Sequence, residues 1–580
     1  MKTVCCLIGF LVWVSMLSAQ QLIRGPYLSS ATPSGICITW RTNQPCNSKV
    51  QFGHQPGSFQ GGVVDNNLTT EHVVVVNGLQ NDQLYFYTIG SSTLLLQGDS
   101  QNYFRTLPLP DSLYEQPIRL IAVGDAAKAT PNEARMRNAL LQYTAQQEVR
   151  GYLMLGDNSY PSGLDSNYQQ GFFDFFQSTI TKHTVLWPAL GNHEYNNDYT
   201  LRRTHTIPYF DVFTLPVSGE SGGVASHTER YYAFNIGNVH CVQLDSYGLE
   251  EVGGQYYGLA DTVNSPQIAW LKQNLDSNKL PWVLVSFHHP PYCMGTHNSD
   301  TEADLALIRQ QVIPILERYN VDLVLNGHSH TYERSCFMHH HYGDEASYNA
   351  TLHRVQDGSA KEDGSPASCP YIKHTGTSGA VDSGTVYAVI GSGSAVPQPP
   401  QLTWPHAAMY YSNYLDNGCL LLTIEGNRLM GEWISTDTSQ VVKDRFVLYK
   451  NVNRLHHLQG TLGQTLAITP GWKGPHTYIW NTADSTAILN WAILHDTVLW
   501  VHDSLSCLSD TFYLKLVQPM EVYEPGHTEI SLYPDPVNTS CTLRGLPAGR
   551  NQVIVYNAYG QALWQEERDI REGEVWTIET

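Results

Sequence analysis

The apolar residues of the chain follow three different spacings. In residues 21–107 apolar and polar positions alternate, as in GICITW (35–40), which is typical of strands with one buried face. In residues 117–450 continuous apolar runs of strand length alternate with longer amphipathic stretches. From residue 451 onward the alternation returns without helical stretches. The pattern predicts a β domain, then an α/β domain, then small β modules.

The first β segment carries a tyrosine signature. Leu79 is followed six residues later by Tyr85 and then by Tyr87, a spacing that matches the tyrosine corner of immunoglobulin-like sandwiches. Residues 21–110 therefore resemble a fibronectin type III-like domain. We expect this domain to act as a scaffold.

Helical stretches lie between the apolar runs of residues 115–450. The candidates are PNEARMRNALLQYTAQQ, SPQIAWLKQNLD and TEADLALIRQQVIPILERY. Ser265 followed by Pro266 is a good start signal for the second of them. Alternation of strands and helices indicates an α/β domain.

The N-terminus reads MKTVCCLIGFLVWVSMLSAQQ, which is one lysine, a short apolar run and then small residues. This arrangement predicts a secretory signal peptide over residues 1–20, and hence a secreted or cell-surface protein. No later segment is long and apolar enough for a transmembrane anchor.

The C-terminal part is expected to hold an immunoglobulin-like β module over residues 451–522 and a partial sorting-like β domain over residues 523–580. SLYPDPVNTS and the residues after it resemble the C-terminal sorting domain of the Bacteroidetes type IX pathway, which implies contact with secretion machinery. Two features depart from that family. Asp535 stands where the family usually has Asn, and WTIET ends the sequence before the family's final strands.

Charge and cysteine content narrow the classes of function. The chain of 580 residues has 33 basic and 53 acidic residues, so nucleic-acid binding through a basic face is excluded. The 11 cysteines include no CxxC pair, which excludes a zinc ribbon or a redox motif of that kind. Cys37 with Cys46, and Cys336 with Cys369, are candidate disulfides. The pairing and the oligomeric state stay open.

Polar clusters follow five of the apolar runs in the α/β segment. They are GDAA with Asp125, GDNSY with Asp157 and Tyr160, GNHE with Asn192 and His193, VSFHH with His288, and GHSH with His328 and His330. Because open α/β sheets place their sites at the carboxyl ends of strands, we expect the five clusters to converge. A glycine before a ligand lets the backbone turn sharply.

The residue types in these clusters are those of a metal site. Oxygen ligands from Asp, Asn and Tyr together with imidazoles suit ferric iron, zinc or manganese. Seven such side chains are too many for one tetrahedral ion but fit two ions that share one carboxylate. A lone cluster of this kind would more often be a helix cap or a packed histidine. The full set of five clusters in this order indicates a metal site.

The order of the clusters resembles the purple acid phosphatase branch of the calcineurin-like metallophosphoesterases. The resemblance covers residues 21–450, and the tyrosine of GDNSY is its specific element. It implies a metallophosphoesterase-type β-sandwich flanked by helices, within an α/β fold class, and an acid phosphatase activity on small phosphorylated substrates. Ala127 departs from the usual GDxG pattern, for which we expect only a changed turn.

The same resemblance implies a ligand set. Asp125, Asp157, Tyr160 and His330 would hold ferric iron. Asp157, Asn192, His288 and His328 would hold a divalent zinc, manganese or iron ion. His193 and His297 would act on the leaving group, and a surface-loop position is the alternative for His297.

Two other functions compete with a monoester phosphatase. One keeps the metals and hydrolyses phosphodiesters or nucleotide pyrophosphates. The other is a non-enzymatic surface-binding protein built from β modules, which leaves the seven ligand-type residues without a purpose.

Overall fold

The structure is a computed structural model that describes residues 19–374, 384–395, 397–517, 531–533, 540–556 and 562–579. The predicted signal peptide lies outside these ranges except for its last two residues. The chain divides into two compact units. The first comprises residues up to His456 together with residues 469–489 and 499–512, and it contains all the predicted site residues.

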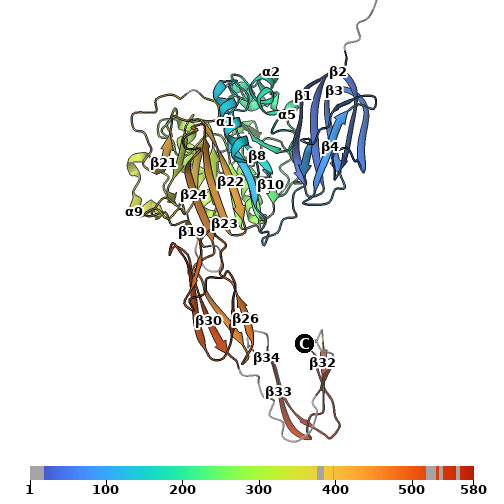
Figure 1. Cartoon of the computed structure of the whole chain (residues 1–580), viewed down its shortest axis with the longest axis vertical. Coiled ribbons are helices and arrows are strands. Elements are labelled where there is room, and N and C mark those ends of the chain that lie inside the picture. The colour runs from blue at the N-terminus through green and yellow to red at the C-terminus, as the bar shows by residue number, and fades with distance from the viewer. Residues whose placement is uncertain are drawn as a thin grey trace, which may run out of the picture. The chain divides into compact units, whose positions relative to one another are not determined.

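The N-terminal strands form a β domain (blue in Figure 1). They are β1 (Leu22–Thr32), β2 (Gly35–Gly53), β3 (Gly61–Asn77), β4 (Leu84–Gly90), β5 (Leu95–Gln97) and β6 (Tyr103–Arg105). The Tyr85 hydroxyl accepts a hydrogen bond of 3.1 Å from the backbone N–H of Gln80. The Tyr87 hydroxyl donates to the carbonyl of Lys182 at 2.8 Å and so fixes the β domain to the α/β domain.

The first sheet of the α/β domain has three parallel strands at its centre. These are β7 (Ile118–Val123), β8 (Gly151–Leu155) and β9 (Val185–Ala189). On one side the sheet continues into β22 (Gly418–Glu425), β23 (Arg428–Ser435), β24 (Val442–Lys450) and β19 (Tyr371–Lys373), which Figure 1 shows in succession. On the other side β9 meets β1 of the N-terminal domain.

The second sheet also contains parallel strands at its centre. Its members in spatial order are β10 (Tyr232–Ile236), β11 (Val239–Gln243), β14 (Trp282–Ser286), β15 (Leu323–Asn326), β20 (Val386–Ile390), β16 (Tyr332–Ser335) and β21 (Met409–Asn413). Alternate residues of β14 face different cores. Trp282 and Leu284 join the core shared with the first sheet, whereas Val283 and Val285 pack among residues of the helices. The first four residues of the strand are all apolar because both of its faces are buried.

The helices cover the outer faces of the two sheets. The longer ones are α1 (Pro131–Tyr143), α6 (Pro266–Ser277), α7 (Ala303–Gln311) and α8 (Ile313–Arg318). As predicted, α6 begins after Ser265, whose hydroxyl accepts the N–H of Ile268, with Pro266 at its first position. The single helix predicted over residues 301–319 is wrong. It divides at Val312, just before Pro314, which has no N–H for a continuous helix.

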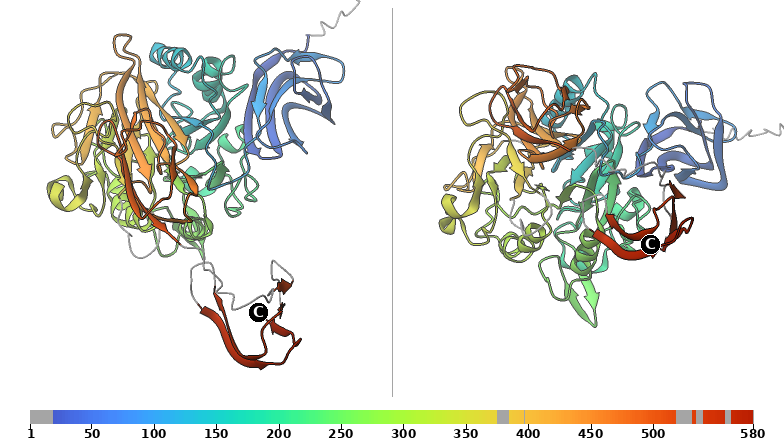
Figure 2. Two further views of the ribbon diagram at one scale, coloured as in Figure 1. Left: turned by 60° about the horizontal axis from the view of Figure 1, so that its bottom comes forward. Right: turned by 90° about the horizontal axis from the view of Figure 1, so that it is seen from below.

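Short elements complete the α/β domain. They are α2 (Asp165–Asn167), η1 (Tyr168–Phe173), α3 (Asp174–Phe176), α4 (Tyr199–Thr204), α5 (Tyr209–Val212), η2 (Glu345–Ser347), α9 (Ala350–His353), β12 (Glu250–Val252), β13 (Gln255–Tyr257), β17 (Phe337–Met338) and β18 (Arg354–Gln356). The hairpin of β12 and β13 projects from the domain, as the right-hand view of Figure 2 shows in green.

Only strands occur in the described residues beyond β24. They are β25 (Leu455–Gly460), β26 (Thr465–Ile468), β27 (Tyr478–Trp480), β28 (Leu489–Ala492), β29 (Thr497–Asp503), β30 (Ser509–Leu516), β31 (Ser531–Tyr533), β32 (Ser540–Arg544), β33 (Gly549–Tyr556), β34 (Ala562–Ile570) and β35 (Trp576–Glu579). No helix in the described part of the chain is long and apolar enough to cross a membrane.

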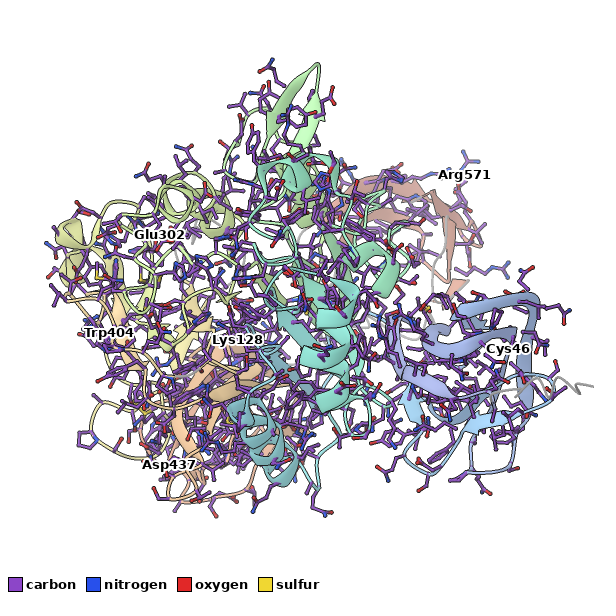
Figure 3. The ribbon with its side chains drawn as sticks, turned by 90° about the horizontal axis from the view of Figure 1, so that it is seen from above. Cys46, Lys128, Glu302, Trp404, Asp437 and Arg571 are labelled. Atoms are coloured by element: carbon purple, nitrogen blue, oxygen red, sulfur yellow. A yellow bond between two sulfur atoms is a disulfide. The ribbon has the colours of Figure 1, made fainter. Side chains whose placement is uncertain are left out.

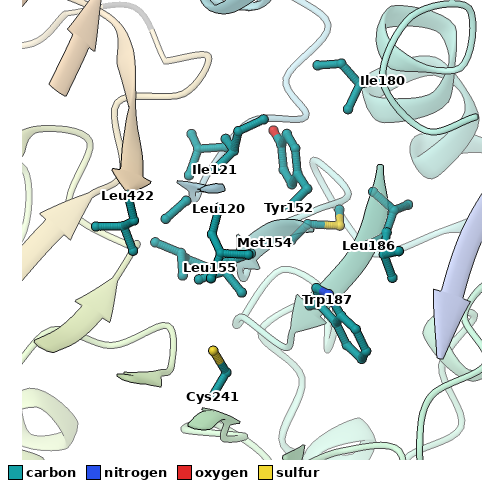
Figure 4. Packing of buried hydrophobic residues seen from close by; sticks show 14 of the residues in the cluster. Leu120, Ile121, Tyr152, Met154, Leu155, Ile180, Leu186, Trp187, Cys241 and Leu422 are labelled. Carbon is teal, nitrogen blue, oxygen red and sulfur yellow. The ribbon is translucent and has the colours of Figure 1, made fainter. Parts of the chain in front are cut away.

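The core of the α/β domain holds the site-bearing strands rigidly. Figure 4 shows side chains from β7, β8 and β9, among them Leu120, Tyr152 and Trp187, packed together with Leu422 of β22. Each of these four side chains is at most 1% exposed. The fold is the predicted class, an α/β β-sandwich flanked by helices, with all-β segments before and after it.

The disulfide differs from both candidate pairs. Cys369 bonds to Cys507, 138 residues further along the chain. Cys336, Cys37 and Cys46 are free. The pairs proposed from the sequence are therefore wrong. Cys37 and Cys46 are held apart on the single extended strand β2, and Cys369 is bonded to Cys507, which comes from a distant part of the same compact unit.

We expect Cys507→Ser to lower the stability of the protein without changing the site. Closing a long loop restricts the unfolded chain, and a disulfide of this kind contributes roughly 2–4 kcal/mol. Calorimetry under oxidising conditions should show a lower unfolding midpoint than for the wild type. A reductant should lower the midpoint of the wild type toward that of the variant and leave the variant unchanged. Equal midpoints in oxidising buffer would contradict the expectation.

Candidate metal centre

All five polar clusters lie where strands of the two sheets end. Asp125, Asp157 and Asn192 follow β7, β8 and β9, while His288 and His328 follow β14 and β15. The clusters thus come from two packed sheets rather than from one open sheet. Because these strands are parallel within each sheet, their carboxyl ends meet at one edge of the sandwich.

The glycines before the ligand-type residues mainly provide space. A Cβ atom on Gly191 would lie 2.2 Å from Asp157 Oδ1, and one on Gly327 would lie 2.7 Å from Asp125 Oδ2. The left-handed backbone conformation falls largely on the following residues instead, since Asp125 has φ 57° and Asp157 has φ 54°. The sequence prediction of a sharp turn at the glycine fits only Gly156, with φ 89°.

One half of the centre is rich in oxygen atoms. The Tyr160 hydroxyl lies 2.7 Å from Asp125 Oδ1 and 2.8 Å from Asp157 Oδ2. His330 Nε2 lies 3.3 Å from the same hydroxyl and 3.4 Å from Asp125 Oδ1. A single phenolic hydrogen cannot satisfy both carboxylates at once, so this group offers more acceptors than donors.

The other half is rich in imidazole. His288 Nε2 lies 3.3 Å from Asp157 Oδ2 and 3.0 Å from Asn192 Oδ1. His328 Nδ1 lies 3.1 Å from the same amide oxygen and 3.3 Å from His288 Nε2. Asp157 therefore contacts both halves of the centre, while its role as a carboxylate shared by two metal ions stays a prediction.

Hydrogen bonds from neighbouring groups orient these side chains. The carbonyl of Leu155 lies 2.8 Å from His288 Nδ1 and accepts its hydrogen, so that the neutral ring presents the lone pair of Nε2 to the centre. Asn192 donates its amide hydrogen to Asn197 at 2.8 Å, so its oxygen faces the histidines. The backbone N–H of His193 donates to Asp157 Oδ1 at 2.9 Å, which leaves Oδ2 for the centre. Such supporting bonds are typical of metal sites.

Burial and neighbouring charges both shift the pKa values of the side chains in the centre. Burial and the carboxylates of Asp125 and Asp157 raise the pKa of Tyr160 well above its ordinary value. Burial acts to lower the pKa of His288, but the Asp157 carboxylate outweighs it and the pKa rises to about 9. Burial lowers the pKa of His328 to about 4. A positive charge is needed before the Tyr160 phenol can ionise.

The two histidines predicted to act on a leaving group flank the centre. His193 Nδ1 lies 2.6 Å from the carbonyl of Pro161, and its ring centroid is 4.3 Å from that of Tyr160. The His297 ring packs 3.7 Å from the ring of His328, centroid to centroid. His297 Nδ1 lies 2.9 Å from a carboxylate oxygen of Glu302. Both side chains are partly exposed, at 26% and 32%.

Three further residues contact the centre. They were not among the site residues predicted from the sequence. Glu302 lies 3.6 Å from His328 Nε2 as well as beside His297. Lys128 places its ammonium nitrogen 3.3 Å from His330 Nε2, and Figure 3 labels both Glu302 and Lys128. Glu194, the acid of GNHE, is buried below the loops. Lys128 could have been found from its place directly after GDAA, whereas nothing in the sequence marks Glu302.

The comparisons with known proteins agree with this geometry. Residues 118–332 match the family described as calcineurin-like phosphoesterase. Fold and match together define a phosphoesterase enzyme with a calcineurin-like metallophosphoesterase domain.

Homologues at low identity are purple acid phosphatases and related enzymes. Purple acid phosphatase 23 of Arabidopsis thaliana is 26% identical over 365 residues, which cover 56% of this chain and 71% of the relative. Acid phosphatase type 7 of Mus musculus is 28% identical over 330 residues, covering 52% and 68%. A purple acid phosphatase from seeds of yellow lupin (Lupinus luteus) has the same fold, with a TM-score of 0.51 and 17% identity, covering 73% of this chain and 74% of that one.

Glu194 ties the loops of the centre together, so we expect Glu194→Gln to weaken it. Its carboxylate accepts the backbone N–H groups of Asp157 at 2.9 Å, Asn158 at 2.5 Å and Gly191 at 2.6 Å. An amide keeps only one acceptor oxygen and turns an NH₂ group toward these donors. Metal affinity or activity should fall about 10- to 100-fold, as for other supporting residues of metal sites.

Metal titration followed by a hydrolysis assay would measure this loss. Glu432→Gln is a matched control, because Glu432 is also buried but pairs with Arg445 on the neighbouring strand. The control should bind metal like the wild type. Equal affinity and activity in the two variants would show that Glu194 does not support the centre.

Proposed function

We propose that the chain is a secreted acid phosphatase that hydrolyses phosphate monoesters at a centre of two metal ions. The observation that carries the proposal is the position of Asp157, which contacts both the Tyr160 hydroxyl and His288 Nε2 through one oxygen atom. The names of the homologues, acid phosphatases among them, agree with this function.

The donor atoms suit two ions. Ligands about 2.1 Å from one ion lie about 3 Å from each other. The contacts between the seven predicted ligands, at 2.7 to 3.4 Å, have this spacing. The oxygen-rich group would hold ferric iron through Asp125, Asp157, Tyr160 and His330. The less negative group of Asp157, Asn192, His288 and His328 would hold a divalent ion, namely zinc, manganese or iron.

Two such ions supply positive charge for a phosphoryl group and lower the pKa of water. The chain itself supplies proton transfer. Because the Pro161 carbonyl accepts the Nδ1 hydrogen of His193, the Nε2 atom is free to carry a second proton. Protonated His193 would give that proton to the departing alkoxide. Glu302 accepts the Nδ1 hydrogen of His297 in the same way.

Localisation is proposed from the chain ends. The pattern of residues 1–20 supports secretion, and the sorting-like pattern of residues 523–580 supports contact with secretion machinery. A fractionation experiment with the intact chain would test both, since the protein should appear outside the cytoplasm.

Metal analysis of the purified protein, followed by assays with an aryl phosphate and an aryl phosphodiester, tests the function. We expect two metals per chain and a higher kcat/KM for the monoester at acidic pH. A preference for the diester would favour a phosphodiesterase. A protein that binds no metal and stays inactive after addition of iron and zinc would support the non-enzymatic alternative.

A further inference from the structure

Lys128 lies directly beside the proposed metal centre. Its ammonium nitrogen lies 4.1 Å from the centroid of the Tyr160 ring and 3.3 Å from His330 Nε2. The backbone N–H of Lys128 donates to the Ser394 hydroxyl at 3.2 Å, and that hydroxyl in turn donates to the carbonyl of Asp125. The base of the lysine is thus fixed to the loop that carries Asp125.

The ammonium group of Lys128 does not take the place of a metal ion between the carboxylates. Lys128 forms no ion pair within 4 Å of Asp125 or Asp157 in the described part of the chain, and its nitrogen lies over the Tyr160 ring rather than between the carboxylates. The side chain is half-buried, so it borders the site and also reaches solvent. A cation over an aromatic face is held there by the ring quadrupole.

No other lysine or arginine side chain contacts the seven predicted ligands within the described ranges. The ligands themselves include two carboxylates and a phenol on one side of the centre. On the other side they include imidazoles, which must be neutral to bind metal. The fixed positive charge that the protein adds to this region is therefore that of Lys128.

We propose that Lys128 is a specificity-determining residue that favours doubly charged phosphate monoesters over singly charged diesters. The proposal rests on the function proposed above. A monoester carries up to two negative charges near neutral pH, because the second pKa of a phosphate monoester is about 6. A diester carries one. An added positive charge near the bound oxyanion stabilises the more negative ligand more strongly.

A purely structural role for Lys128 would give a different pattern. If the lysine only packs on Tyr160, its loss should change the turnover of both ester classes in parallel. If it only balances Asp125 and Asp157 before metals bind, its loss should change metal content. Neither role predicts a change in the ratio between the two substrates.

Lys128→Met tests the proposal because it keeps the length of the side chain and removes its charge. Lys128→Arg keeps the charge, and Lys473→Met removes a lysine that pairs with Glu115 elsewhere on the surface. Each metal-loaded protein is assayed with 4-nitrophenyl phosphate and bis(4-nitrophenyl) phosphate at about pH 7, above the second pKa of the monoester, and its affinity for inorganic phosphate is measured by calorimetry at the same pH. Metal content is determined on the same samples.

We expect Lys128→Met to lower kcat/KM for the monoester at least tenfold and for the diester at most threefold. Phosphate binding should weaken to a similar extent as monoester hydrolysis. Lys128→Arg should restore most of both, and Lys473→Met should match the wild type. Parallel losses on both esters, unchanged phosphate affinity, or loss of metal in Lys128→Met would each overturn the proposal.

The same experiment separates this proposal from the proposed function. A wild-type protein that holds two metals but hydrolyses neither ester would refute the phosphatase function itself. An active wild type whose substrate ratio does not change in Lys128→Met would refute only the role of Lys128.

Discussion

An Asp157→Ala variant is expected to lose hydrolysis of an aryl phosphate by at least about 10³-fold, together with at least one metal ion. Among the residues that the structure describes, Asp157 alone contacts both halves of the centre through a single atom, Oδ2. Its other oxygen accepts the N–H of His193. The substitution therefore removes the link between the two proposed ion sites and also frees the backbone that carries Asn192 and His193.

A second readout of this variant needs no activity. In the metal-free protein the Asp157 carboxylate is the main cause that raises the pKa of His288 to about 9, against the effect of burial. Without the carboxylate, burial should lower that pKa substantially, opposed only by Asp125 and the Leu155 carbonyl. Titration of the His288 ring by NMR in metal-free wild type and variant would measure the change.

An Asp276→Ala variant, which alters an exposed carboxylate on α6, should behave like the wild type in both measurements. Near-normal turnover by Asp157→Ala with two metals still bound would sink the assignment of a shared ligand.

The sequence predicted the site-bearing strands well for a local reason. Each strand is a run of apolar residues buried on both faces, and a polar cluster follows where it reaches the edge of the sandwich. β8 and the GDNSY cluster illustrate this, since Gly151–Leu155 is fully buried and Asp157 follows two residues later. The same local pattern pointed to the seven candidate ligands. The structure brings these side chains together, and their binding of metal stays a prediction.

Features that depend on distant parts of the chain could not be predicted. The partner of Cys369 is 138 residues away, and no spacing rule connects two strands so far apart. Glu302 directly precedes α7 and contacts His297 nearby in the chain as well as His328 of a separate loop, which local patterns do not show. The division of the strands between two sheets, with β7 to β9 in one and β14 to β15 in the other, came from the family resemblance, because local apolar patterns do not reveal which strands pair.

The residue that gives the centre its specific character is Tyr160, and a Tyr160→Phe variant is expected to abolish the colour of the oxidised, iron-loaded protein. A phenolate bound to ferric iron gives a charge-transfer band in visible light, which carboxylates and imidazoles do not. In the protein without metal, burial, Asp125 and Asp157 keep this phenol protonated by raising its pKa. The hydroxyl lies within 3.3 Å of one atom of each of the other three proposed iron ligands.

The fold of the variant should be retained because only one hydroxyl group is removed and the ring can still pack beside His193. Absorption spectra and metal content must be measured on the same sample, since zinc or manganese alone would leave any version of the protein colourless. Tyr195→Phe is a suitable control, because the buried Tyr195 hydroxyl donates to Asp245 rather than to a proposed ligand. The control should keep the band. A wild-type protein that holds ferric iron and is colourless would refute Tyr160 as an iron ligand, whatever its activity.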